Sequence, residues 1–196
     1  MTADDRVRCA WIDESRLSPD DFEIYRDYHD TEWGRPLRDS KALFERVTLE
    51  AFQSGLSWLI ILRKRENFRR AFHQFDVERV ARYGERDITR LMADAGIVRN
   101  RAKIEATIAN ARAVGDLDTD LAELLWSFAP SPRPRPARMA DVPAVTPEST
   151  AMAKELKRRG FRFVGPTTAY ALMQATGMVD DHTADCWVAV IDHAPS

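Results

Sequence analysis

The two cysteines of this chain stand near its opposite ends, and thiols can pair, react or bind metal. Cys9 lies in "VRCAW" and Cys186 in "VDDHTADC", where His182 precedes it by four residues. The histidine nearest to Cys9 is His29, in "YRDYHDTEWG". Because two cysteines in a reducing compartment are poor candidates for a disulfide, they are either buried free thiols or part of a metal site. Composition alone leaves both interpretations open.

A single carboxylate falls on the apolar face of a predicted helix. In residues 41–54, apolar and small side chains recur three or four residues apart, and Glu50 shares this stripe with Leu43 and Val47. Desolvation disfavours its charge, so Glu50 either pairs with a basic residue or has a function. Large aromatic side chains also occur in this half of the chain, at Trp11, Tyr25, Tyr28, Trp33 and Trp58. They are either core residues or a stacking pocket for a nucleic-acid base.

A turn containing glycine joins two predicted helices in "GFRFVGPTTAYALMQATG". It resembles the helix-hairpin-helix motif of DNA repair proteins, although Phe163 stands where the first glycine is usual. The residues that match the motif are Val164, Gly165, Thr168 and Ala169. Backbone N–H groups at such a helix start can bind a DNA phosphate. The alternative is an ordinary pair of antiparallel helices.

Length and composition predict one globular domain, residues 1–196, that is expected to be cytoplasmic. The 196 residues are 44% hydrophobic and 31% charged, without a long apolar run, and the first eight residues lack the apolar core of a signal peptide. The net charge of −2 argues against strong indiscriminate binding to nucleic acid. Three basic clusters, residues 63–70, 99–103 and 157–162, are either solvated helix faces or phosphate contacts.

Helical periodicity dominates the chain, so we predict an all-α fold without strands. Helices are expected at residues 39–55, 85–96, 98–113, 119–129, 151–160 and 166–177. Asp39 or Ser40 is a suitable N-cap for the first, and Gly55 ends it. A proline-rich loop, residues 129–148 approximately, interrupts the pattern because proline cannot continue a helix.

Several motifs together resemble the 3-methyladenine DNA glycosylase I family, bacterial enzymes that remove alkylated adenine from DNA. They are "RCAW", "YHDTEWG", "LFERVTLE", "SGLSW", "ILRKRENFRRAFHQFD", "DAGIVRNRAKIEATIANARA", "LLWSF" and "LKRRGFRFVGPTTAYALMQATGMVDDH". The resemblance runs in order from Arg8 to Cys186. It departs at Ala51 and Phe52, where the family has small and amide residues, and at the insertion-like "ESRLSPDD". Phe52 is therefore expected to reshape a pocket wall.

The resemblance implies a structural zinc held by Cys9, His29, His182 and Cys186. The spacing of His182 and Cys186 agrees with this, since residues four apart share one helix face. Four protein ligands leave no position for an activated water, so the zinc would join the two ends of the chain. His73 and His193 are alternative ligands, less favoured because neither has a cysteine at helical spacing.

The resemblance also implies a base-flipping mechanism in which an aromatic pocket receives the extruded base. Trp58 would stack on the base, Trp11, Tyr25 and Trp33 would belong to the aromatic wall, and Tyr28 and Glu50 would bind the polar edge. Because 3-methyladenine in DNA is cationic, the aromatic rings and the carboxylate favour it over normal adenine.

The expected partner is double-stranded DNA that contains alkylated bases, bound by a monomer. Gly55 and Leu56 would fill the gap left by the flipped base, and the hairpin would hold phosphates. The residues expected at the hairpin contact are Arg162, Val164, Gly165 and Thr168. Thr167 occupies the place where bifunctional glycosylases use a catalytic lysine, which predicts base excision without strand cleavage.

Two other classes compete with this interpretation. A zinc-stapled module that only binds DNA would not need Glu50, and a zinc hydrolase would need an open metal position. Asp180 also has two interpretations, because an aspartate two residues before a histidine is catalytic in many helix-hairpin-helix glycosylases. We favour a structural role, in which Asp180 or Asp181 caps a helix carrying His182 and Cys186 or orients a zinc ligand.

Overall fold

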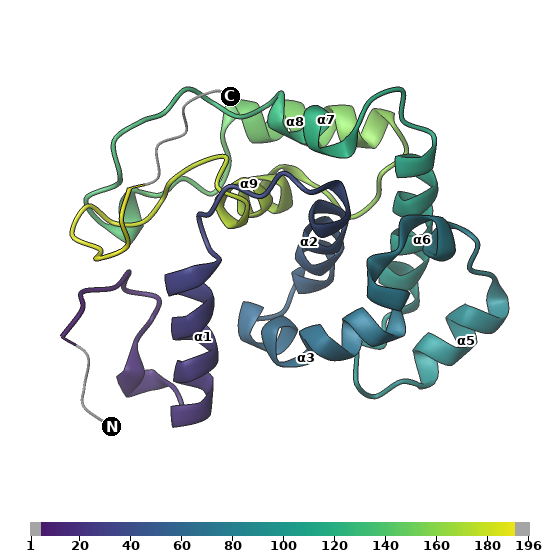
Figure 1. Ribbon diagram of the computed structural model, residues 1–196, viewed down its shortest axis with the longest axis horizontal. Helices are drawn as coiled ribbons and strands as arrows, with labels where there is room; N and C mark the ends of the chain where they lie inside the picture. The colour runs from purple at the N-terminus through teal and green to yellow at the C-terminus, as the bar shows by residue number, and fades with distance from the viewer. Residues whose placement is uncertain (1–4, 191–196) are drawn as a thin grey trace.

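The computed structural model describes residues 5–190, and its regular elements there are all helical, which confirms the all-α prediction (Figure 1). None of the described helices is both long and apolar enough to cross a bilayer. In chain order the elements are η1 (Glu14–Arg16), α1 (Pro19–Thr31), α2 (Ser40–Gln53), α3 (Trp58–Ala71), η2 (His73–Phe75), α4 (Val77–Ala81), α5 (Glu85–Ala93), α6 (Arg101–Gly115), α7 (Leu121–Trp126), η3 (Met139–Asp141), α8 (Pro147–Arg158) and α9 (Pro166–Ala175).

Each of the six predicted helices is present, as α2 and α5 to α9. The cap of α2 is Asp39, whose side chain accepts a hydrogen bond from Ala42 N at 2.8 Å. Gly55, just beyond the end of α2, has a φ of +78° that a glycine adopts without strain. α8 begins four residues before its expected start, because Thr146 caps it and Pro147 suits its first turn. The end of the proline-rich segment therefore belongs to α8.

Two apolar clusters organise the fold. The main core lies among α2, α3, α6, α8 and α9 and includes the fully buried rings of Phe44, Phe52, Phe68, Phe72 and Phe75. A smaller cluster joins α1 to both ends of the chain. Its buried members are Cys9, Tyr28, Trp33, Leu62, Ala175, Cys186 and Val188. Trp58 contacts both clusters, which places it where they meet.

The N-terminal segment with α1 and the loop after α9 lie together at one side of the molecule (Figure 1). Trp187 N donates a hydrogen bond to Val7 O at 2.9 Å, which joins the two ends directly. The loop before α2 also crosses the end of α9, where a Cβ at Gly177 would lie 2.6 Å from the backbone of Arg35. Only glycine allows the two backbones to approach this closely.

The turn between α8 and α9 occupies the predicted hairpin position. Phe163, which replaces the usual glycine, adopts a φ of +58° and is exposed, so the residue carries backbone strain. The buried side chain of Asn110 on α6 fixes this turn. Its Oδ1 accepts from Arg162 N at 2.7 Å and its Nδ2 donates to Arg162 O at 3.1 Å.

Replacement of this amide should weaken the hairpin. We expect Asn110→Ala to lower the free energy of unfolding by about 1 to 3 kcal/mol, because two backbone groups lose their partners. Chemical denaturation measures the change. Arg162→Ala is the matched control, since it removes an exposed side chain but keeps both backbone hydrogen bonds. Equal stability of Asn110→Ala and the parent would contradict the role of the amide.

Candidate active site and metal cluster

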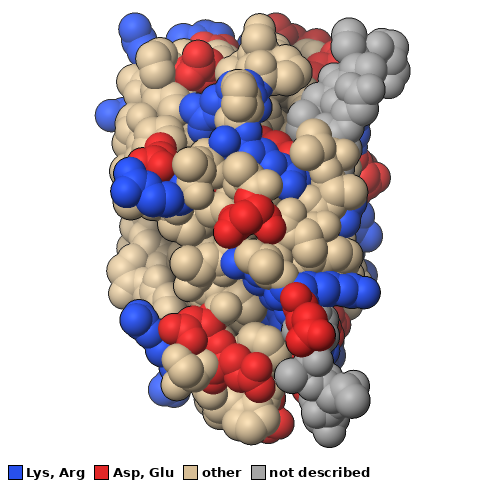
Figure 2. Space-filling view, turned by 90° about the vertical axis from the view of Figure 1, so that its left-hand side faces the viewer, with Lys and Arg blue, Asp and Glu red and all other residues tan. Residues whose placement is uncertain are grey.

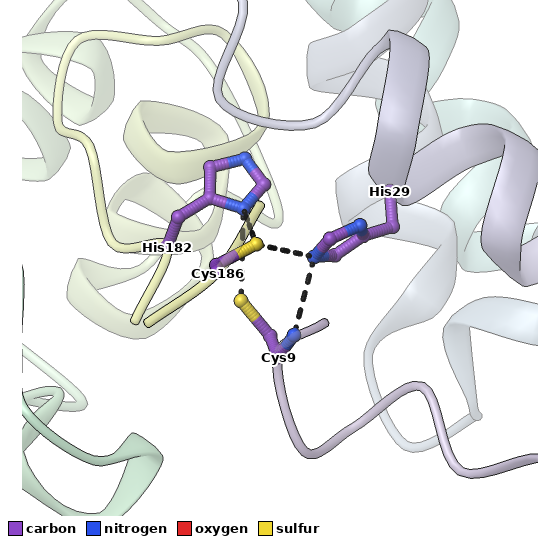
Figure 3. Close-up of side chains that lie close together, drawn as sticks. All are labelled: Cys9, His29, His182 and Cys186. Atoms are coloured by element: carbon purple, nitrogen blue, oxygen red, sulfur yellow. Dashed lines mark hydrogen bonds between the residues drawn. The ribbon is translucent and has the colours of Figure 1, made fainter. Parts of the chain in front are cut away.

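Four side chains from the two ends of the chain converge in the smaller apolar cluster. Cys9, His29, His182 and Cys186 are all buried and point toward one another (Figure 3). One ligand atom from each lies within 4.8 Å of all the others. The structure therefore brings together the four residues that the resemblance implied, from α1 and from two loops.

The spacing of these atoms suits a tetrahedral metal ion. The Sγ atom of Cys186 lies 3.4 Å from His182 Nδ1 and 3.6 Å from His29 Nε2, and Cys9 Sγ lies 3.6 Å from His182 Nδ1. With Zn–S and Zn–N bonds of about 2.3 and 2.0 Å, sulfur and nitrogen ligands of one Zn²⁺ lie roughly 3.5 Å apart. The donor set and its geometry therefore fit zinc.

The outer nitrogen of each histidine is already engaged, as is usual for metal ligands. His29 Nδ1 lies 2.7 Å from Asp30 Oδ1, and Asp30 also accepts a hydrogen bond from Arg8 Nη2 at 2.8 Å. His182 Nε2 lies 3.1 Å from the carbonyl oxygen of Trp33. These contacts leave His29 Nε2 and His182 Nδ1 facing the cluster.

The two thiols of the cluster titrate as a pair. Their mutual hydrogen bond, together with burial, raises the pKa of Cys9, whereas that hydrogen bond and those to the histidine rings lower the pKa of Cys186. One sulfur thus keeps a proton, because two adjacent thiolates repel each other. A dication among them would allow both to ionise, which is a further respect in which the donor set fits a metal.

The helical spacing expected for His182 and Cys186 is wrong. Residues 180–190 form a non-helical loop, and Cys186 N donates to Thr183 O at 2.9 Å in a tight turn. Ala184 N donates instead to Pro136 O at 2.9 Å, so a neighbouring segment replaces the helical acceptor. The turn still brings the Cys186 thiol to the His182 ring.

Since no helix follows Asp180, the helix-capping role is also wrong, but an orienting role fits. Asp180 Oδ1 accepts from His182 N at 3.3 Å, and its Oδ2 accepts from Arg135 Nε at 2.8 Å. Asp181 is buried and accepts from Tyr170 and Gln174 of α9. Both carboxylates are thus engaged in holding the loop that carries His182.

The two alternative histidine ligands lie apart from this cluster. His73 begins η2, between α3 and α4, and its ring nitrogen contacts the hydroxyl of Tyr83, which follows α4. His193 lies outside the described residues.

The five predicted aromatic residues form one cluster beside the metal ligands. The Trp11 ring lies 5.4 Å from Tyr25 and 5.3 Å from Trp33, and Tyr28 lies 5.5 Å from Trp58. Trp33 also packs edge-on against His182 at 4.7 Å, so it links the aromatic cluster to the Cys/His cluster. Tyr25 Oη accepts from Leu59 N at 3.1 Å and so fixes the start of α3, the helix that begins with Trp58.

Glu50 is buried beside Tyr28, with 5% of its surface exposed. Among residues 5–190 no protein group donates a hydrogen bond to its carboxylate. The buried Trp58 Nε1 also has no acceptor within this range. Burial raises the pKa of Glu50 to about 7, although the nearby Arg46 opposes the rise. A buried acid without a protein donor, close to aromatic rings, can recognise a polar, cationic ligand.

The effect expected of Phe52 on the pocket does not follow from its position. Its ring lies 4.8 Å from Phe68 and 6.1 Å from Phe72, inside the main core. Ala51 is also buried. "ESRLSPDD" forms η1 and the start of α1, where Ser18 is the N-cap.

The turn after α2 presents Gly55 and Leu56 at the surface. Both are exposed, and the Leu56 side chain is among the exposed large apolar groups. Lys103 of α6, the last residue of the basic cluster 99–103, is buried and anchors this turn by donating from Nζ to Phe52 O at 2.8 Å and Ser54 O at 2.6 Å. The exposed Leu56 side chain thus lies on a turn whose backbone Lys103 holds in place.

The start of α9 offers backbone N–H groups to an anion. Gly165 is its N-cap and supplies no capping side chain, and Arg162 and Gly165 are exposed while Thr168 is partly so. The Val164 side chain is buried and contributes to the core instead. The face that carries α1 is different, since Lys and Arg side chains are interspersed there with Asp and Glu, and neither charge dominates (Figure 2).

Charged side chains gather around Tyr28, the neighbour of Glu50. Arg46 lies one helical turn before it on α2, and donates to Tyr28 Oη at 3.1 Å and Glu32 Oε2 at 3.3 Å. Arg65 of α3 donates two hydrogen bonds to Glu32, at 2.6 and 2.8 Å. The four-residue spacing of Arg46 and Glu50 is the sequence signal that indicates a basic neighbour for Glu50, because residues four apart share a helix face.

Comparison with known proteins identifies this arrangement. The family model of methyladenine glycosylases matches residues 19–189. The chain belongs to this family. It is 46% identical over 185 residues to DNA-3-methyladenine glycosylase 1 of Escherichia coli (strain K12), covering 91% of this chain and 95% of that one.

Solved structures of methyladenine glycosylases have the same fold. A 3-methyladenine DNA glycosylase I matches with a TM-score of 0.87 and 44% identity, covering 94% of this chain and 100% of that one. The Staphylococcus aureus 3-methyladenine DNA glycosylase I, studied for its recognition of 3-methyladenine, matches with a TM-score of 0.84 and 36% identity, covering 94% and 97%. These matches confirm the resemblance inferred from the sequence motifs.

The raised pKa of Glu50 predicts a pH-dependent stability. In the folded protein this pKa is about 7, above its ordinary value of 4.5, so ionisation favours the unfolded chain. The cost is absent well below pH 4.5, grows between pH 4.5 and 7 and is complete above pH 7. Compared with the parent, Glu50→Gln should gain about 2 kcal/mol more unfolding free energy at roughly pH 8 than at roughly pH 5. Glu123→Gln, on the exposed face of α7, should show no such difference. A pH-independent effect of Glu50→Gln would contradict the shift.

Proposed function

We propose that this protein is a DNA glycosylase that hydrolyses the N-glycosidic bond of 3-methyladenine in DNA. Membership of the methyladenine glycosylase family and the names of its relatives support this activity. The observation that carries it in this chain is the buried Glu50 carboxylate close to Tyr28, whose ring packs against Trp58. Excision from DNA would place the protein in the compartment that holds DNA.

Charge supplies the selectivity in this proposal. The extruded 3-methyladenine is cationic, so it gains Coulomb attraction from the ionised Glu50 and cation–π attraction from the rings. Normal adenine is neutral and gains neither. Binding the base would stabilise the ionised Glu50, because a cation then faces the carboxylate that burial disfavours.

The remaining steps follow from the exposed turns. Leu56, held by the anchored turn after α2, would occupy the space that the flipped nucleotide leaves in the duplex. The free N–H groups at the start of α9 would bind a phosphate and fix the backbone. The positive base is already a good leaving group, so water can complete the hydrolysis without a strong general acid.

Strand cleavage is not part of the proposed reaction. Thr167, at the second position of α9, is exposed and has no amine to form a covalent intermediate. The amine of Lys103 donates to two carbonyl groups and is committed to the turn after α2. A monofunctional reaction fits both residues.

We further propose that Cys9, His29, His182 and Cys186 hold one structural zinc. Their burial, spacing and engaged outer nitrogens support a closed tetrahedral site. The zinc would neutralise two thiolates and hold the ends of the chain together, and no ligand position would remain for a water. The closed site disfavours a zinc hydrolase, and the buried Glu50 disfavours a module that only binds DNA.

Release of free base from methylated DNA by the purified protein tests the proposed activity. We expect Glu50→Gln to lower the single-turnover rate for 3-methyladenine by at least about tenfold, because it removes the negative charge that faces the cation. Asp180→Asn, near the metal cluster, should stay within about fivefold of the parent. Equal rates for Glu50→Gln and the parent would refute the role of Glu50. A hundredfold loss in folded, metal-bound Asp180→Asn would make Asp180 a catalytic residue.

Elemental analysis tests the metal. The purified protein should contain close to one zinc per chain, and the Cys9→Ala plus Cys186→Ala variant should contain almost none. The variant should also unfold at a lower temperature, because the cluster joins residues that are 157 apart in sequence. Zinc at less than about half an equivalent in the parent, or full retention in the variant, would contradict the proposal.

A further inference from the structure

Arg46 is a buried cation inside the proposed base pocket. Only 9% of its surface is exposed. Its guanidinium carbon lies 5.3 Å from the centre of the Tyr28 ring and 5.6 Å from that of the Trp58 ring. A buried guanidinium must find partners for its charge and its N–H groups, so its contacts are informative.

The carboxylate of Glu32, which pairs with both Arg46 and Arg65, fixes the position of the Arg46 guanidinium. Arg46 Nη2 donates to Glu32 Oε2 at 3.3 Å, and both oxygens of Glu32 accept from Arg65, at 2.6 and 2.8 Å. The bidentate Arg65 contact orients the carboxylate, and the carboxylate orients Arg46. Three helices, α1, α2 and α3, therefore determine where Arg46 Nη1 points.

The contact from Nη1 determines the direction of the Tyr28 hydroxyl. Arg46 Nη1 lies 3.1 Å from Tyr28 Oη. A guanidinium has only donors, so the phenol oxygen is the acceptor and the phenol proton is directed elsewhere. Within residues 5–190 no protein group accepts that proton, and the hydroxyl is left as a hydrogen-bond donor beside Glu50.

We propose that Arg46 is a positioning residue for base recognition, which makes the Tyr28 hydroxyl donate its proton to an unprotonated ring nitrogen of the extruded purine. This inference rests on the proposed glycosylase function and names how the polar edge of the base is selected. Glu50 attracts the positive charge of the base, whereas the oriented Tyr28 hydroxyl requires an acceptor at a fixed place. Together they select a base that is cationic and still offers a lone pair.

Glu32 pairs with Arg46 and Arg65 but neutralises only one of them, so the four charged groups sum to zero when Glu32 and Glu50 are both ionised. The Arg46 guanidinium is engaged with Tyr28 and Glu32. The Glu50 carboxylate receives no hydrogen bond from a protein group among residues 5–190, so it is the group left to face a cationic base.

A double-mutant cycle in the full-length, metal-bound protein tests the inference. Single-turnover release of 3-methyladenine is measured for Arg46→Met, Tyr28→Phe and the double variant, and tryptophan fluorescence reports the affinity for free 3-methyladenine. Each single change should lower both quantities by about tenfold, the scale of one hydrogen bond in a buried site. The double variant should be no worse than either single variant, because Arg46 acts through the Tyr28 hydroxyl. Independent effects that multiply, or an unchanged Arg46→Met, would overturn the inference.

Conservative and matched variants separate positioning from stability. Arg46→Lys keeps one buried donor and should recover release to within about threefold of the parent. Arg69→Met removes a different arginine–glutamate contact, the one between Arg69 of α3 and Glu45 of α2 at 2.8 Å. This variant should leave the rate of base release unchanged. Should Arg46→Met fail to fold, Arg46→Leu, which also removes every donor, completes the same cycle. A parent protein that releases no base would contradict the proposed function, whereas an active parent with multiplying effects would contradict the inference alone.

Discussion

The convergence of Cys9, His29, His182 and Cys186 is the constraint on which the rest of the site depends. His29 lies on α1, and so do Tyr25 and Tyr28, so one helix carries both a member of this Cys/His cluster and two residues of the aromatic cluster. Tyr25 in turn fixes the first turn of α3, where Trp58 begins the helix. The position of the aromatic cluster is therefore coupled to the Cys/His cluster that joins the ends of the chain.

Two glutamates near that cluster, the partly exposed Glu32 and the buried Glu50, show how hydrogen-bond donors decide the charge of a carboxylate. Although burial disfavours the charge of Glu32, hydrogen bonds and charge from Arg65 and Arg46 lower its pKa. Glu50 lies one helical turn after Arg46 on α2 but receives no hydrogen bond from residues 5–190, and burial raises its pKa. One acid is thus held permanently as a structural anion, and the other keeps its charge available for a ligand.

Sequence patterns predict helices well because they depend on neighbouring residues. They do not predict contacts between residues that are far apart in the sequence. Periodicity and caps such as Asp39 placed six helices, because both signals come from neighbouring residues. α1 and α3 were not assigned, since the charged residues on their contacting faces form ion pairs across helices, such as Arg65 with Glu32. The loop after α9 was expected to be helical, but distant acceptors such as Pro136 hold its backbone. The site residues came mainly from family motifs, and Arg46 was missed because its partners lie on another helix.

The order in which a ribosome makes this chain has a consequence for the buried thiols. Cys9 and His29 emerge early, but their partner Cys186 is 157 residues after His29. At about 5 to 20 residues per second, translation of that interval takes roughly 8 to 30 s. Cys9 is fully buried in the folded protein, yet during this period its partner residues from the C-terminal loop do not exist. The newly made chain therefore carries an accessible thiol that only the end of synthesis can enclose.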